Sequence, residues 1–201
     1  MEEQERQIVH GVIDMFMRYG IRSVTMDDVA RELGVSKKTI YKFFSNKAEL
    51  VDVSFRMFFS ELRNQIVEVS SATENAIDEL FLLDQTLSDT IKRNHPGIFF
   101  QLRKYYPATY QFLFSERQKL VMELTRKNIL KGIEQGLYRD DFNVDIISFL
   151  YYSKMLMMHQ EVESMEECNV EDIIWENKIY HIRGIATEKG LQHLKNKLNK
   201  E

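Results

Sequence analysis

The chain has 201 residues, of which 44% are hydrophobic, and it carries 27 basic and 31 acidic residues for a net charge of −4. This length and apolar content support a globular protein with a buried core, which excludes a disordered chain. The single cysteine, Cys168, excludes an intramolecular disulfide and a four-cysteine zinc site. The acidic N-terminus has no apolar core of a secretory signal, and no apolar run reaches the ~18 residues of a membrane span. We therefore expect a cytoplasmic protein with no membrane contact.

The first expected helix covers residues 2–19, with its apolar residues on one side and Gly20 at its end. Thr25, followed by the acidic Asp28 three positions later, forms a capping box that predicts the start of a second helix. Gly34 follows the last apolar residue of this helix, where a left-handed C-terminal cap favours a residue without a side chain. The second helix is therefore expected to end after about two turns.

A third short helix is expected from Lys37 to about Phe44, with Ser36 placed to cap it. At ~100° per residue, one side of this helix is apolar, whereas the other side carries lysines, Thr39 and Tyr41. Four lysines and no acidic residue occur between positions 33 and 48, so the positive charge is local. Two paired short helices with such a surface indicate a helix-turn-helix that binds DNA, the alternative being a solvated lysine face on an ordinary helical hairpin.

The remainder of the chain also has helical periodicity, with two prolines, eight glycines and scarcely any strand-like alternation. We expect an all-α fold, with an N-terminal three-helix domain and a C-terminal helical bundle. The later helices are predicted at about 46–69, 73–93, 98–106, 108–136 and 144–163, and a last segment begins at 170 and is interrupted at Gly184 and Gly190.

The residues of the helix-turn-helix resemble the N-terminal signature of the TetR/AcrR repressor family. The resemblance rests on Thr25, Val29, Ala30, Gly34, Val35, Tyr41, Lys42, Phe43, Phe44, Lys47 and Leu50, and covers about the first fifty residues. The resemblance implies that Thr25 contacts a DNA phosphate, that the third helix is the recognition helix, and that Lys47 binds the DNA backbone. The implied DNA-binding residues are Thr25, Lys37, Lys38, Thr39, Tyr41, Lys42, Phe43 and Lys47.

We place the domain boundary near residue 48, with a DNA-binding domain at 1–48 and a regulatory domain at 49–201. Aromatic and methionine side chains in the second domain suit an adaptable apolar pocket, although such residues at helical spacing also form ordinary cores. The resemblance favours an effector pocket, for which the candidates are Phe59, Leu83, Phe99, Tyr105, Tyr110, Phe114, Met155 and Met158.

The last two long helices carry apolar residues on more than one side, so each needs a second packing partner. Burial within the monomer is one explanation, whereas the resemblance implies that the two helices pair with those of a second subunit. A homodimer would present two recognition helices to a palindrome. The candidate interface residues are Ile147, Tyr151, Ile174 and Trp175.

No catalytic motif accompanies the five scattered histidines, so we expect neither an enzyme nor a cofactor. The pairs His10 with Asp14 and His159 with Glu163 lack the further ligands of a metal site, and no metal is expected. The sequence therefore predicts a transcriptional regulator, a repressor that binds a palindromic DNA operator as a homodimer and is released by a small apolar or aromatic effector. A DNA-bound adaptor that answers to a protein partner, and a helical enzyme or binding domain that imitates the head, are the alternatives.

Overall fold

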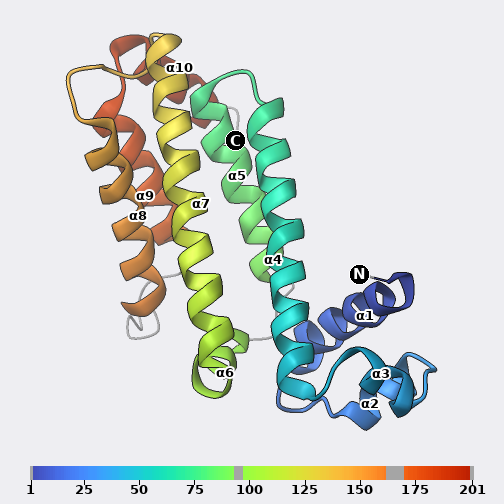
Figure 1. The fold of residues 1–201 in the computed structure, drawn as a ribbon. Coiled ribbons are helices and arrows are strands. Elements are labelled where there is room, and N and C mark those ends of the chain that lie inside the picture. The colour runs from blue at the N-terminus through green and yellow to red at the C-terminus, as the bar shows by residue number, and fades with distance from the viewer. Residues whose placement is uncertain (1, 93–96, 162–169, 200–201) are drawn as a thin grey trace. The chain divides into compact units, whose positions relative to one another are not determined.

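The computed structural model describes residues 2–92, 97–161 and 170–199, and within these ranges the chain is helical and has no strand. The helices, coloured by position in Figure 1, are α1 (Glu3–Tyr19), α2 (Met26–Glu32), α3 (Lys37–Phe43), α4 (Lys47–Ala72), α5 (Ala76–Lys92), α6 (Ile98–Tyr105), α7 (Pro107–Glu134), α8 (Val144–Glu161), α9 (Val170–Ile185) and α10 (Glu188–Leu198). The prediction of an all-α chain is confirmed. The expected last segment is two helices, α9 and α10, because Thr187 caps a new helix by accepting a hydrogen bond from the amide of Gly190.

The chain divides into two compact units, which we call unit 1 (Met1–Ile66 and Thr86–Arg117) and unit 2 (Val67–Gln85 and Gln118–Glu201). Helices α4, α5 and α7 each contribute residues to both units. The expected boundary near residue 48 separates DNA binding from regulation and stays a prediction about function.

The core of unit 1 joins the first three helices to α4 and α6. Phe16 of α1 stacks on Phe55 of α4, with 6.2 Å between the ring centroids. Ile98 and Leu102 of α6 lie in the same buried cluster, although they are distant from α1 in the sequence. Burial of each such side chain contributes about 1.5–3 kcal/mol to the free energy of unfolding. Helix α6 is therefore a structural part of unit 1.

Polar contacts add to this packing in unit 1. The backbone amide of Arg22, in the turn between α1 and α2, donates to Oε1 of Gln101 in α6 at 2.9 Å. The hydroxyl of Thr109 in α7 donates to Oδ1 of Asp52 in α4 at 2.7 Å. These contacts fix the orientation of α6 and of the start of α7 relative to the other helices of unit 1. Hydrogen bonds can do so because they are directional, whereas apolar packing is not.

The core of unit 2 is formed by the start of α5, the end of α7 and helices α8 to α10. In this unit α8 and α9 lie side by side (Figure 1). Gly190 of α10 lies so close to the backbone carbonyl of Leu137 that a Cβ atom would be 2.1 Å from its oxygen. Only glycine permits this approach of α10 to the turn after α7.

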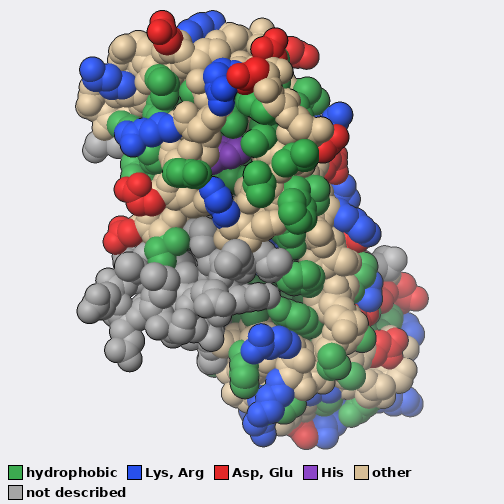
Figure 2. Space-filling view, turned by 90° about the vertical axis from the view of Figure 1, so that its left-hand side faces the viewer, with side chains coloured by type: hydrophobic (Ala, Val, Ile, Leu, Met, Phe, Trp, Pro, Cys, Tyr) green, Lys and Arg blue, Asp and Glu red, His purple; other side chains and the backbone are tan. Residues whose placement is uncertain are grey.

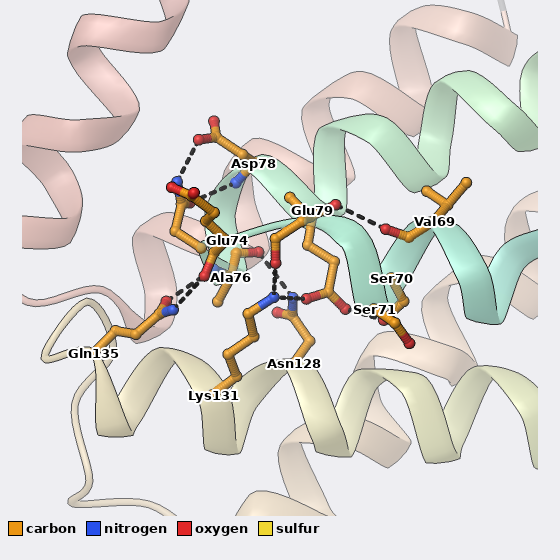
Figure 3. Close-up of polar contacts among 12 residues, drawn as sticks. Val69, Ser70, Ser71, Glu74, Ala76, Asp78, Glu79, Asn128, Lys131 and Gln135 are labelled. Atoms are coloured by element: carbon orange, nitrogen blue, oxygen red, sulfur yellow. Dashed lines mark hydrogen bonds and ion pairs between the residues drawn. The ribbon is translucent and has the colours of Figure 1, made fainter.

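A polar network in unit 2 joins the turn between α4 and α5 to α7 (Figure 3). The buried carboxylate of Glu79 pairs with Nζ of Lys131 at 2.8 Å and accepts a hydrogen bond from Ser70 at 2.5 Å. Nζ of Lys131 also donates to the carbonyl oxygen of Thr73. Nδ2 of Asn128 donates to the carbonyl oxygen of Ala76 at 2.8 Å. The network satisfies a charge that would otherwise be costly to bury.

Among the described helices, none combines the length and the apolar character that crossing a membrane requires.

Candidate DNA-binding surface

Helix α2 begins with the capping box that the sequence predicts. The amide of Asp28 donates to Oγ1 of Thr25 at 3.2 Å, and the amide of Thr25 donates to Oδ2 of Asp28 at 2.9 Å. Hydrogen bonds from Thr25 hold the pKa of Asp28 below its usual value, so this carboxylate stays charged at the positive end of the helix. Gly34 adopts the expected left-handed conformation, with φ of 63°.

Helix α3 begins at Lys37 because Ser36 caps it, accepting a hydrogen bond from the amide of Thr39 at 3.0 Å. Ile40 and Phe44 are buried and Phe43 is half-buried against the core of unit 1, whereas Tyr41 is 48% exposed. The predicted separation of faces is therefore confirmed. Phe43, proposed as a DNA contact, lies at the border of the packed side.

The lysines of α3 differ in their surroundings. Nζ of Lys37 pairs with Asp27 of α2 at 2.5 Å, and Nζ of Lys42 lies 3.4 Å from a carboxylate oxygen of Glu2. The hydrogen bond from Asp27 raises the pKa of Lys37. Lys38 is exposed and forms no ion pair within the part of the chain that the structure describes. Of these three lysines, Lys38 can thus bind DNA without first releasing an intramolecular carboxylate.

Thr39 and Lys47 have local partners as well. The hydroxyl of Thr39 lies 2.7 Å from that of Ser36, and Nζ of Lys47 donates to the carbonyl oxygen of Ile21 at 2.6 Å. Partial burial lowers the pKa of Lys47. Its ammonium has two further hydrogens for a phosphate. The sequence did not reveal the contact with Ile21, because a lysine at a helix start carries no signal of a carbonyl 26 residues earlier.

The proposed pocket residues do not form one described cluster. Phe59, Phe99, Tyr105, Tyr110 and Phe114 belong to unit 1, and Leu83 is buried in unit 2. Tyr110 and Phe114 are half-buried and stacked at 6.1 Å, whereas Phe99 is 53% exposed. The side chains of Met155 and Met158 lie outside the described residues.

Of the proposed interface residues of α8 and α9, one is buried in unit 2 and three are partly or largely exposed. Tyr151 is buried against the ring of His181, and Ile147 is half-buried against the core. Ile174 is half-buried, and Trp175, which is 37% exposed, meets the ring of Phe81 edge-on with 5.6 Å between the ring centroids.

Other apolar residues of the same two helices, which are not among the candidate interface residues, are also exposed. We call them the apolar face of α8 and α9, which consists of Ile146, Phe149, Leu150 and Tyr180, each between 48% and 67% exposed. Figure 2 looks onto the side that carries these helices, and hydrophobic side chains gather there.

Among the described residues, no group of three or more side chains is placed to hold a metal ion. His10 lies 3.5 Å from Glu61 of α4, and Asp14 takes no part in this contact. The pair His159 and Glu163 lies outside the described side chains.

The chain matches known proteins in its N-terminal region and, in other comparisons, over most of its length. Residues 8–53 match the family model "Bacterial regulatory proteins, tetR family". The transcriptional repressor KstR2 of Mycobacterium tuberculosis is 26% identical over 136 residues, which cover 66% of this chain and 68% of the relative.

Two solved structures show the same fold. A transcriptional regulator from Saccharomonospora viridis in complex with choline superposes with a TM-score of 0.72 at 18% identity, covering 94% of this chain and all of that chain. The regulator FadR of Bacillus subtilis in complex with stearoyl-CoA gives a TM-score of 0.64 at 16% identity, covering 90% of this chain and 98% of that chain.

Proposed function

Because this chain is a TetR family transcriptional regulator, we propose that it binds a palindromic DNA operator as a homodimer, represses transcription, and is released by a small effector. The observation that carries the DNA-binding part is the surface of α3, where Lys38 and Tyr41 are exposed beside Lys37 and Lys42. We place this activity in the cytoplasm, where the DNA is.

Within this surface we assign different tasks to different side chains. Lysine and tyrosine side chains bind phosphates and base edges in the major groove, and base contacts carry the sequence information. Lys38, which forms no ion pair with the residues that the structure describes, is the base-reading candidate together with Thr39. Thr25, Tyr41 and Lys47 are the phosphate-binding candidates.

Selection of binding sites from random DNA tests the function, and Lys38→Ala tests the assignment. We expect a palindrome for the wild type. In the variant, we expect a loss of about 1–3 kcal/mol of discrimination at one position in each half-site. Lys195→Ala, which removes an exposed lysine of α10, is the control and should select the same palindrome with the same preference. No enrichment of any sequence by the wild type would refute the proposed function.

For the homodimer, the apolar face of α8 and α9 supports a two-fold interface. Full burial of a fully exposed large apolar side chain contributes about 1.5–3 kcal/mol, and these four residues, already about half covered, each contribute about half of that on each subunit. A two-fold axis doubles every contact and presents two recognition helices. We expect these helices to lie about 34–36 Å apart in the DNA-bound dimer, to match successive major grooves.

Sedimentation of Phe149→Glu tests the interface. The charge would have to be buried in the dimer, so we expect monomers at concentrations where the wild type is dimeric. Leu191→Glu is the matched control, because Leu191 of α10 is 42% exposed but lies outside this face. A Phe149→Glu protein that stays helical and dimeric would show that the subunits pair elsewhere.

For the effector, we propose an apolar or aromatic ligand of the regulatory part of the chain. Two proteins of the same fold carry choline and stearoyl-CoA, which supports ligand binding but does not identify the ligand. The stacked, half-buried pair of Tyr110 and Phe114 is the candidate contact. Release requires tighter binding to the DNA-incompetent state, because equal affinity for both states shifts nothing.

Native mass spectrometry of the protein purified from cells tests this part by detecting a retained ligand. Titration of that ligand into the operator complex should release the DNA. Phe114→Ala should weaken this response and leave operator affinity without ligand nearly unchanged. A wild-type release curve for the variant would exclude this pair from the binding site.

A further inference from the structure

The end of α6 carries cations that the proposed function does not use. Arg103 and Lys104 occupy its last turn and are exposed. The chain has no aspartate or glutamate from position 90 to 115, although it holds 31 acidic residues in total. Within the described part of the chain, neither residue forms an ion pair. Their charge is therefore available to an outside anion.

Arg22 and Lys104 both contact the aromatic ring of Tyr105, and Arg103 precedes Lys104 in the sequence. Its guanidinium carbon lies 4.9 Å from the ring centroid, and its Nη1 donates to the Tyr105 hydroxyl at 2.9 Å. Nζ of Lys104 lies 5.5 Å from the centroid of the same ring. The two cationic groups are thus within about 10 Å of each other, and Tyr105 holds the guanidinium in place. We call Arg22, Arg103 and Lys104 the α6 cationic cluster.

Arg22 connects the cluster to the proposed DNA-binding surface inside unit 1. Arg22 lies three residues before Thr25, which caps α2. The positive charge of Arg22 helps to lower the pKa of Lys47. Nζ of Lys47 also donates a hydrogen bond to the carbonyl oxygen of Ile21, the residue before Arg22. Arg22 therefore lies beside the expected phosphate contacts, and Lys104 at the end of α6 shares the ring of Tyr105 with it.

From this placement we propose that the α6 cationic cluster binds the phosphate backbone of the DNA beside the contacts of the helix-turn-helix. A guanidinium with one donor engaged has four N–H groups left, enough for a bidentate phosphate contact. Each strand carries one phosphate per ~3.4 Å of helix axis, so a cluster of this extent meets more than one phosphate. The footprint then includes α6, and not only α2, α3 and the start of α4. The inference rests on the proposed function.

The salt dependence of binding measures the number of phosphate contacts, because each contact contributes about 0.9 to the slope of log affinity against log salt. For Arg103→Ala with Lys104→Ala, we expect the slope to fall by about 1.8 for operator and random DNA alike. Between 50 and 200 mM salt, the wild type should therefore lose about tenfold more affinity than the variant.

The control removes the same charge from α10 of unit 2, as Lys189→Ala with Lys195→Ala. It should keep the wild-type slope, which separates a phosphate contact from a change of net charge. Lys104→Glu, a single exposed change, provides a second variant whose slope should fall by about one unit. Circular dichroism would verify that both variants keep their helices.

A wild-type slope in both α6 variants would overturn the assignment. If Lys38→Ala then still altered base preference, the proposed function would stand and only the wider footprint would fail. Failure of the wild type to select any DNA sequence would instead refute the proposed function itself.

Discussion

We expect the stability of unit 2 to depend on pH because it contains a buried histidine. His181 of α9 is 8% exposed, its ring centroid is 4.3 Å from that of Tyr151, and its Nε2 has no hydrogen-bond partner among the described residues. Burial, with a smaller effect from the charge of Lys154, lowers the pKa of His181 from 6.5 to about 4. The histidine is therefore neutral in the folded protein at neutral pH.

The unfolded chain takes up a proton at His181 near pH 6.5, whereas the folded chain takes it up only near pH 4. Between these values the unfolded state binds more protons, so the free energy of unfolding falls as the pH falls. The slope is ~1.4 kcal/mol per pH unit in this window, so lowering the pH from 7.5 to 5.0 should reduce the free energy of unfolding by about 2 kcal/mol through His181 alone.

Urea unfolding of the wild type and of His181→Phe at both pH values, at one protein concentration, measures this contribution. We expect the wild type to lose about 2 kcal/mol more than the variant on acidification. His10→Gln, which changes a largely exposed histidine, should lose as much as the wild type. If wild type and His181→Phe lost stability in parallel, the reasoning from burial would be wrong.

Two further predictions concern ion pairs. Lys131→Met leaves the buried carboxylate of Glu79 without its cation, so we expect the free energy of unfolding, measured with urea, to fall by about 3–5 kcal/mol. Adding Glu79→Gln should recover part of this loss. A loss below about 1 kcal/mol would contradict a buried charge pair. Asp27→Asn frees Lys37 and removes a carboxylate from the α3 surface. Fluorescence anisotropy should show a DNA affinity raised by a few fold and a slope of log affinity against log salt that is steeper by about one unit. Weaker binding would refute a competition between Asp27 and DNA for Lys37.

Local signals in the sequence determined the head of this protein. Thr25 and Ser36 accept the hydrogen bonds that their positions predict, because a cap and its partner amide lie within three residues of each other. The bounds of α2 and α3, and the split of α3 into an apolar and a cationic side, follow from such short-range rules. The family resemblance of the same residues is borne out by the match over residues 8–53.

The tertiary structure alone decided which partners these side chains meet. The apolar positions Ile98 and Leu102 predict a helix that packs, but not that it packs into the core of the head. Likewise, the lysines of α3 are alike in sequence, yet Lys37 is paired with Asp27, whereas Lys38 has no ion pair among the residues that the structure describes. Periodicity gives the side of a helix that is buried, and it carries no information on what lies opposite.

Helix α8 is a second case in which the sequence pattern does not reveal the packing partners. Its apolar residues surround the helix, so the period does not distinguish the side that packs within the chain from the side that remains bare. The contact with α9 buries Tyr151 and leaves Phe149 and Leu150 exposed. Sequence therefore indicated that apolar residues lie on more than one side of α8, and only the packing of the folded chain decided which of them are exposed, because contacts between distant segments depend on three-dimensional geometry.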